Sequence, residues 1–213
     1  GENIYGDHFS TLFYLGGDHP TLKSQFVLDC PRRLNLQTRA FNATVPAARL
    51  QSGDQRRDVL LWELNNTPGV AYENGMPPVV DQLASLQATT MRSWPELSAW
   101  YWNLAQDQFA ATPEMRATVE QIVRGCTTPR DKLRAIHDWV IGNVRYLGIE
   151  LGRYGFKPHR AGETFKALYG DCKDTATLLV ALLRLAGIDS KLVLIRTVNA
   201  GAATCSKPTG RTA

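Results

Sequence analysis

The chain contains the run Leu168-Tyr169-Gly170-Asp171-Cys172-Lys173-Asp174, which is followed by an apolar segment rich in leucine and alanine. Glycine lets the backbone turn sharply at position 170, and Asp171 is a residue type that caps helix N-termini. Asp174 stands three positions later, as in a capping box. The apolar residues recur at helical spacing as far as Gly187, which is placed to end a helix in the left-handed conformation. The run therefore predicts a turn followed by a buried helix, with Cys172 in its first turn.

Cys172 has a chemical and a structural interpretation. The N–H groups at a helix start and the positive end of the helix dipole stabilise a thiolate, and they can also hold an oxyanion during acyl transfer. Lys173 favours the thiolate, whereas Asp171 and Asp174 oppose it. Most free cysteines are instead small, buried, apolar residues. The glycine–aspartate turn before the cysteine favours the nucleophile.

The segments on both sides of this turn extend the pattern. After residues 169–174 come two segments, Ala176-Thr177-Leu178-Leu179 and Leu182-Leu183-Arg184-Leu185-Ala186-Gly187-Ile188. Before them come two others, Val144-Arg145-Tyr146-Leu147-Gly148-Ile149-Glu150-Leu151-Gly152 and Gly155-Phe156-Lys157-Pro158. Together these segments resemble the nucleophile region of bacterial transglutaminase-like proteins. The upstream part, which ends in Ser93-Trp94, resembles the β-rich domain of unknown function that often precedes this core. The resemblance spans most of residues 5–198 and implies a papain-like core with the cysteine at a helix N-terminus.

The same resemblance implies a site that this sequence does not complete. The remaining motifs of the family are a histidine on a strand after the cysteine and an aspartate on the next strand, but no histidine follows Cys172 here. His137 precedes the cysteine in a predicted helix, where a surface or core position is favoured over a role as its partner. We therefore expect the core to be truncated and this chain alone to be inactive.

The composition is that of a globular protein. At 213 residues, the chain is long enough for one large or two modest domains, and its 44% hydrophobic content suits a packed core. The formal net charge of +4 is spread along the chain without a long run of like charges, so we expect no nucleic-acid partner. No apolar stretch is long enough to predict a membrane span. The chain begins with glycine and shows no signal-peptide pattern, which we interpret as a fragment of a longer protein.

The four cysteines, at positions 30, 126, 172 and 205, show neither zinc-binding spacing nor a Cys-x-x-Cys motif. We therefore expect no metal and no cofactor. A disulfide among Cys30, Cys126 and Cys205 stays open as an alternative. The expected partner is a peptide or protein substrate, and the resemblance alone suggests the periplasm or the cell envelope as the location.

Residues 1–92 have the pattern of an antiparallel β domain. Apolar or alternating stretches predict strands over residues 9–15, 24–28, 34–39, 58–64 and 79–90. A turn signal at Gly53-Asp54 and a loop at 73–78 separate these stretches. No cluster of catalytic residue types occurs here, and we expect His8 and His19 to lie in loops or on the surface.

Helical patterns begin at Ser93. The sequence Ser93-x-x-Glu96, with Pro95, predicts a capped helix whose aromatic residues favour packing over a ligand platform. Two further helices are predicted to start at Thr112-Pro113 and at Thr128-Pro129. Their predicted inward residues are Met115, Val119, Ile122 and Val123 in the first, and Leu133, Ile136, Val140 and Val144 in the second.

Residues 148–170 read as a long glycine-rich loop, and loops of this kind commonly line a site. Within it, residues 164–168 favour a short helix. The candidate substrate contacts are Tyr146, Tyr154, Phe156, His159 and Tyr169, although structural roles compete with this interpretation. Beyond the cysteine helix, residues 191–197 predict a strand, and residues 199–213 predict a disordered or non-native tail.

The sequence thus predicts an α+β protein with four parts. These are a β-rich domain at 1–92, as the C-terminal part of a larger one, a connecting helix at 93–112, a truncated transglutaminase-like core at 113–198 and a tail at 199–213. The favoured function, for the full-length parent, is hydrolysis of a peptide or amide bond, or amine transfer, through a thioester on Cys172. The alternative is a non-catalytic peptide-binding or assembly module on the same fold.

Overall fold

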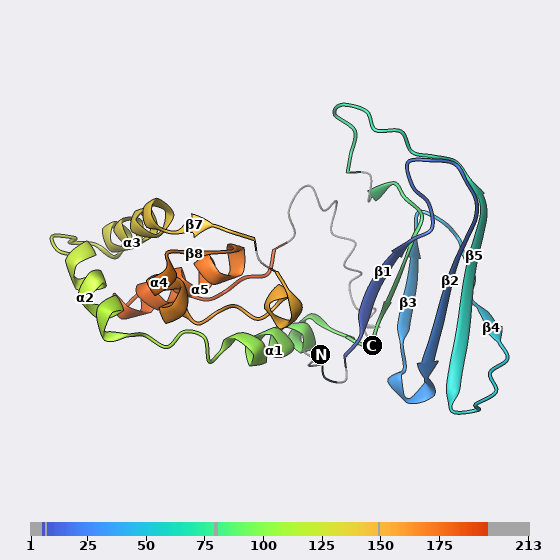
Figure 1. Ribbon diagram of the computed structural model, residues 1–213, viewed down its shortest axis with the longest axis horizontal. Helices are drawn as coiled ribbons and strands as arrows, with labels where there is room; N and C mark the ends of the chain where they lie inside the picture. Colours follow the sequence, from blue (N-terminus) through green and yellow to red (C-terminus); the bar gives the residue numbers. More distant parts are fainter. Residues whose placement is uncertain (1–5, 7, 79–80, 149, 196–213) are drawn as a thin grey trace, which may run out of the picture. The chain divides into compact units, whose positions relative to one another are not determined.

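The computed structural model describes residues 6, 8–78, 81–148 and 150–195. The chain divides into two compact units, with a sequence boundary between Glu96 and Leu97. The first unit is built of antiparallel strands, and the second of helices with a short parallel strand pair (Figure 1). This architecture confirms the predicted α+β class. The predicted tail at 199–213 lies outside the described residues.

The strands described in the first unit form two antiparallel sheets. One sheet has the order β1 (Ser10–Tyr14), β6 (Ser85–Thr89) and β3 (Gln37–Phe41), and the other has the order β2 (Thr21–Pro31), β5 (Arg57–Thr67) and β4 (Ala48–Leu50). The ring of Phe13 on β1 stacks on the ring of Phe26 on β2 at 4.8 Å between centroids, which joins the two sheets. Phe26 in turn stands opposite Trp62 on β5. The core between the sheets consists of Leu15, Leu28, Cys30, Val45, Trp62, Ala84, Leu86 and Ala88.

The predicted strand over residues 34–39 is wrong in its first half. Residues Arg32–Leu34 form the 3-10 helix η1, and Asn35 takes a left-handed conformation with φ of 46°. Pro31 ends the preceding strand because it lacks an N–H group, and asparagine tolerates the left-handed region. Strand β3 therefore starts only at Gln37.

Two further strand boundaries differ from the prediction. In the segment predicted as a strand over 79–90, residues 81–84 are irregular and β6 begins at Ser85, whereas residues 79–80 lie outside the described part. Sequence reasoning also missed the three-residue edge strand β4, whose side chains are all exposed. An exposed short strand carries no alternation of buried and exposed residues, so no pattern marks it.

The second unit contains several described helices, and all of them except α4 begin where the sequence signals predict. They are α1 (Trp94–Ala105), α2 (Pro113–Ile122), α3 (Pro129–Asn143), α4 (Ala161–Ala167) and α5 (Cys172–Leu185). Ser93 Oγ accepts the Glu96 N–H at 3.2 Å at the start of α1. At the start of α3, Thr128 and Asp131 form a complete capping box. None of the helices described here has the length and apolar character that crossing a bilayer requires.

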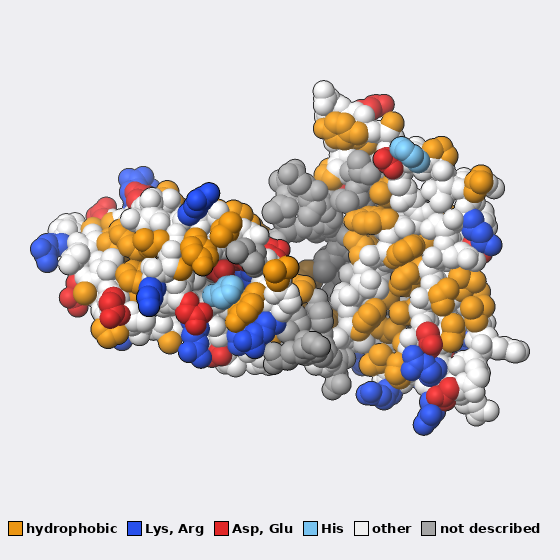
Figure 2. Space-filling view, in the orientation of Figure 1, with side chains coloured by type: hydrophobic (Ala, Val, Ile, Leu, Met, Phe, Trp, Pro, Cys, Tyr) orange, Lys and Arg blue, Asp and Glu red, His pale blue; other side chains and the backbone are white. Residues whose placement is uncertain are grey.

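The core of the second unit lies between α2, α3, α4 and α5. Its buried residues are Met115, Val119, Ile136, Val140, Ala161, Leu178, Ala181, Leu182 and Leu183. Most of the predicted inward residues take part, but Leu133 is 45% exposed, so this part of the prediction is wrong. It lies in the first turns of α3, one turn before Ile136, the first α3 residue in the buried core. Apolar side chains also remain exposed on the visible surface of both units (Figure 2).

The region predicted as one long loop contains regular structure. The 3-10 helix η3 (Gly152–Gly155) precedes α4, and the strands β7 (Arg145–Tyr146) and β8 (Tyr169–Gly170) pair in parallel. The predicted helix over 164–168 is real but starts earlier, at Ala161, and ends before Leu168, which takes a left-handed φ of 54°.

The strand predicted over residues 191–197 is not formed in its described part, 191–195; residues 196–197 lie outside the described chain. β-branched residues favour a strand, but a strand also needs a partner for its backbone hydrogen bonds. Val193 and Ile195 are both exposed here.

Candidate active site

The turn before α5 has the predicted geometry. Asp171 is the N-cap, and its Oδ1 accepts the N–H groups of Lys173 and Asp174 at 3.0 and 3.1 Å. Asp174 Oδ2 accepts the Asp171 N–H at 3.3 Å, which completes the capping box. Gly187, with φ of 80°, follows the helix end as predicted. These bonds fix the first turn of α5, where Cys172 lies.

Cys172 is exposed and free. The alternative interpretation expected a buried, apolar cysteine at this position, and that is not what the structure has. Cys30 and Cys126 are also free, which removes a disulfide between them, while Cys205 lies outside the described residues. Within the described chain, the backbone N–H of Cys172 has no hydrogen-bond acceptor, and it therefore stands available beside the thiol.

The charges around Cys172 are largely paired. The Lys173 ammonium group forms an ion pair with Asp171 Oδ2, and both side chains are mostly buried. The positive charge of Lys173, which is adjacent to Cys172 in the sequence, is thus paired with the Asp171 carboxylate. The N-terminal end of α5, where Cys172 lies, carries the positive end of the helix dipole.

Gly170 is required for a reason that differs from the predicted sharp turn. Its φ lies outside the left-handed region, but a Cβ at this position would stand 2.7 Å from Asp174 Cβ and 3.3 Å from Thr164 Cγ2. Its carbonyl oxygen accepts the Leu147 N–H at 2.9 Å, which ties β8 to the end of β7. Glycine is therefore needed because the chain passes so close to α4 and α5.

His159 and Asp174 form a pair that sequence reasoning did not find. The His159 backbone N–H donates to Asp174 Oδ1 at 2.8 Å, and its ring Nδ1–H donates to Asp174 Oδ2 at 3.0 Å. The Tyr154 ring stacks on the imidazole, with 4.0 Å between centroids and 10° between planes. The two members of the pair are fifteen positions apart in the chain, on a loop and a helix, and no local pattern connects them.

The other predicted contacts are distributed around this region. Phe156 packs edge-to-face on Trp100 of α1 at 5.9 Å, whereas Tyr146 and Tyr169 are exposed on β7 and β8. His137, the minority candidate for a catalytic partner, is exposed on α3 and contacts the carboxylate of its neighbour Asp138 at 3.1 Å.

Tyr101 of α1 is a further residue that sequence reasoning missed. Burial raises the pKa of its phenol, and the negative charges of Cys172, Asp171 and Asp174 raise that pKa further. The phenol therefore lies within electrostatic range of the first turn of α5. Only its place in the aromatic stretch of α1 could have marked it in the sequence, and that stretch predicted packing.

A cavity of about 200 Å³ adjoins the turn. Its lining residues come from the position after β7, from the loop before α4, and from α4, β8 and the start of α5. They are Leu147, His159, Glu163, Thr164, Ala167, Tyr169, Gly170 and Asp174. It brings together two of the predicted substrate contacts, His159 and Tyr169. Among the described residues, no group of three or more histidine, cysteine or acidic side chains is arranged to hold a metal.

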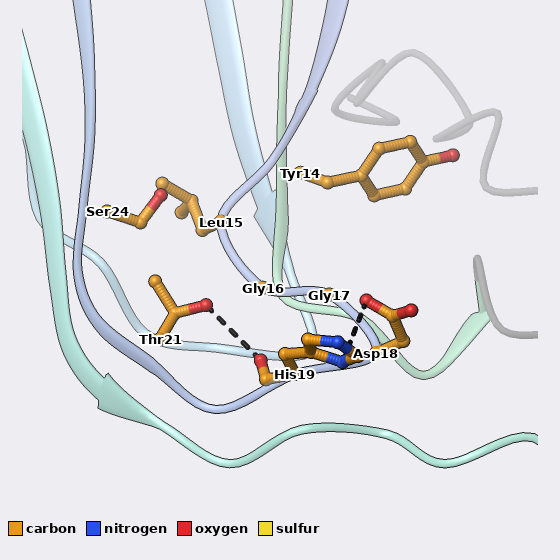
Figure 3. A pocket seen from close by; sticks show the side chains of 8 residues that line it. All are labelled: Tyr14, Leu15, Gly16, Gly17, Asp18, His19, Thr21 and Ser24. Atoms are coloured by element: carbon orange, nitrogen blue, oxygen red, sulfur yellow. Dashed lines mark hydrogen bonds and ion pairs between the residues drawn. The ribbon is translucent and has the colours of Figure 1, made fainter.

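The β unit has a hollow of its own, about 230 Å³ in volume, around the turn that follows β1 (Figure 3). Gly16 and Gly17 are among its lining residues, as are Asp18 and His19, which contact each other at 3.5 Å. Both of these side chains are almost fully exposed, so His19 lies on the surface. His8, in contrast, is partly buried, with Nδ1 3.8 Å from Glu96 Oε1.

Residues 116–208 match the family model of the Transglutaminase-like superfamily. This segment includes α3, α4 and α5 with Cys172, and it is a transglutaminase-like domain. The family resemblance predicted from the residues around Cys172 is thereby confirmed.

Two solved structures are similar to the chain. One is described as a putative protease from Parabacteroides distasonis, with 19% identity and a TM-score of 0.73 over 89% of this chain and 36% of that one. The other is described as a putative cysteine protease from Cytophaga hutchinsonii, with 13% identity and a TM-score of 0.34 over 84% of this chain and 62% of that one. The first establishes a shared fold, and the chain spans about a third of the length of that protein. No curated protein sequence matches the chain.

Proposed function

We propose that the chain carries the nucleophile of an amide-bond enzyme, with Cys172 as the catalytic residue. The thiolate sulfur attacks the carbonyl carbon of a peptide or amide, a thioester forms, and the carbon–nitrogen bond breaks as the departing nitrogen takes up a proton. Water or an amine then attacks the thioester and restores the thiol. The products are an acid and an amine in the first case, and a new amide in the second.

One observation carries this proposal: an exposed thiol stands in the first turn of a buried, fully capped helix. At that place the helix dipole favours the thiolate, and the N–H groups of the first turn, including that of Cys172, are the kind of donors that stabilise an oxyanion. The reaction also needs a base and an acid. The resemblance supplies them from a histidine after the cysteine, so the proposed activity belongs to the whole protein.

Alkylation with iodoacetamide, followed site by site with mass spectrometry, tests the nucleophile. Cys172 should react faster than both other described thiols. Cys126 is the matched control, because it is partly exposed but follows a helix C-terminus instead of opening a helix. Cys30 should react slowest, because burial, followed by the charges of Asp58 and Asp29, raises the pKa of its thiol.

Substitution then separates chemistry from stability. In the full-length protein, Cys172→Ser should abolish cleavage or amine transfer on peptide amides while the free energy of unfolding stays nearly unchanged, since the side chain is exposed. Two outcomes contradict the proposal. One is that the Cys172 thiol reacts no faster than Cys126, and the other is that Cys172→Ser keeps full activity per folded molecule.

A non-catalytic peptide-binding module is the second candidate, favoured by the exposed rings of Tyr146 and Tyr169 on adjacent strands. In that case peptides bind wild type and Cys172→Ala with equal affinity, and neither protein converts them. Peptide turnover by the wild-type protein eliminates this candidate.

A further inference from the structure

The carboxylate of Asp174, in the first turn of α5, accepts three hydrogen bonds. It receives the backbone N–H of Asp171, the backbone N–H of His159 and the ring Nδ1–H of His159. Its side chain is only 5% exposed. A carboxylate buried to this degree is stable only while its hydrogen bonds are kept, because an unpaired buried charge is costly.

The segment that presents His159 is itself held on both sides. Pro158 is fully buried, and Lys157 forms an ion pair with Asp107 at 3.3 Å. On the other side, the Ala161 N–H donates to the Gln108 carbonyl at 2.8 Å. The imidazole, stacked on Tyr154, is therefore presented to Asp174 by a fixed piece of chain.

Helix geometry determines which role this pair can have. Cys172 and Asp174 are two positions apart in an α-helix, so their side chains leave the axis about 200° apart. Because His159 is bound to Asp174, it approaches α5 on the side away from the thiol. This placement does not suit a base that takes the Cys172 proton, but it suits a residue that holds the turn in place.

We infer that His159 and Asp174 are positioning residues, which fasten the turn from Gly170 to Asp174 and thereby set the orientation of the Cys172 thiol and N–H. Asp174 links the two sides of the turn, because it accepts from Asp171 before the cysteine and from His159 in the facing segment. The close approach of Gly170 to Asp174 belongs to the same arrangement. The consequence for thiol reactivity rests on the proposed role of Cys172 as nucleophile.

Three variants test the inference. His159→Ala removes the ring donor, His159→Asn keeps an N–H donor at nearly the same position, and His137→Ala is the control, since that ring is exposed and contacts only its neighbour Asp138 among the described residues. The measured quantities are the alkylation rate of Cys172, the hydrogen exchange of the peptide spanning residues 169–175, and the free energy of unfolding.

We expect His159→Ala to slow alkylation of Cys172 by at least about tenfold and to speed exchange of the Lys173 and Asp174 amides. His159→Asn should restore both to within about threefold of wild type, and His137→Ala should change neither. Between about pH 6 and about pH 9, His159→Ala should lower the alkylation rate by a constant factor, because a positioning residue does not take the proton.

Exchange and alkylation also distinguish this inference from the proposed function. If the wild-type thiol reacts no faster than Cys126, the nucleophile proposal fails, while faster exchange of residues 169–175 in His159→Ala still supports the pair. The inference is overturned if exchange is unchanged in folded His159→Ala, or if that variant alters the shape of the pH profile. Should His159→Ala fail to fold, Tyr154→Leu removes the ring that stacks on His159, together with its contacts to Arg153. Unchanged exchange in that variant is equally contradictory.

Discussion

Asp171 and Asp174 are buried acidic side chains that hold the turn of the candidate site in place through their hydrogen bonds. Asp171 accepts two backbone N–H groups and the Lys173 ammonium group, and Asp174 accepts from Asp171 and His159. Each charge therefore has several donors, which is the condition under which a buried carboxylate is tolerated. The chain around them is closely packed, and at Gly170 there is no room for a Cβ atom beside Asp174.

Gly170→Ala should therefore destabilise the protein by about 1–3 kcal/mol, because the new Cβ would meet Asp174 Cβ at 2.7 Å. Alkylation of Cys172 should slow at the same time. The matched control is Gly142→Ala in α3, where a Cβ meets nothing within 4 Å, and which should stabilise the protein by about 0.5–1 kcal/mol. Chemical denaturation measures both changes. If Gly170→Ala and Gly142→Ala change the free energy of unfolding equally, the close contact between residue 170 and Asp174 is contradicted.

Among the elements, the long β2–β5 pair carries a polar network on its exposed face. Glu63 of β5 accepts from Gln25 at 2.6 Å and from Asn65 at 2.9 Å, and it pairs with Lys23 at 2.9 Å. The bond from Asn65, followed by those from Lys23 and Gln25, lowers the pKa of Glu63 from its ordinary 4.5 to about 2. Cross-strand pairs of this kind help to set the strand register.

This network has a pH dependence of definite sign. Because the pKa of Glu63 is lowered on folding, its contribution to stability is present above about pH 4.5 and is lost as the pH falls towards 2. Thermal unfolding should show wild type losing more stability than Glu63→Gln across this window. Glu120→Gln, at an exposed position on α2, is the control and should follow wild type. Parallel pH curves for wild type and Glu63→Gln would show that the network contributes nothing.

At the scale of the whole molecule, the described residues form two hydrophobic cores that have no residue in common. In the second unit, α5 supplies the centre of the core, with Leu178 and Leu182 fully buried. The turn that carries Cys172 lies at the N-terminal end of this same helix, so the packing of α5 also holds that turn in place. The first unit is held by the contacts between its two sheets, including the Phe13–Phe26 stack.

A pair of leucines in the second unit tests the position of its core. Leu178→Ala should cost about 2–5 kcal/mol, because the side chain is fully buried and a cavity remains. Leu133→Ala, at a position that is 45% exposed, should cost less than about 1 kcal/mol. Both values come from denaturant titration of the purified variants. If Leu133→Ala lowers the free energy of unfolding by more than this, Leu133 points inward, as its helical spacing predicts.

The features predicted correctly are those whose signals lie within a few residues of one another. The capping box at Asp171, the helix start at Thr128 and the bounds of α5 all follow from local pattern and residue type. The strands β2 and β5 were also found, although both extend beyond the predicted residues 24–28 and 58–64. Capping bonds join residues three apart, and burial periodicity repeats within one or two turns. Such information is present in the sequence before any folding takes place.

The features that were missed or wrong depend on which distant segments meet. The His159–Asp174 pair, the nearness of Tyr101 to the cysteine turn and the tight contact at Gly170 all join residues on different elements. The same holds for residues 191–195, whose composition favours a strand but which have no strand partner in the described chain. Hydrogen bonds and close contacts between elements exist only after the chain has packed, and a one-dimensional pattern does not encode their geometry. The sequence therefore placed the cysteine at its helix start, and the packed structure alone showed what holds that turn in place.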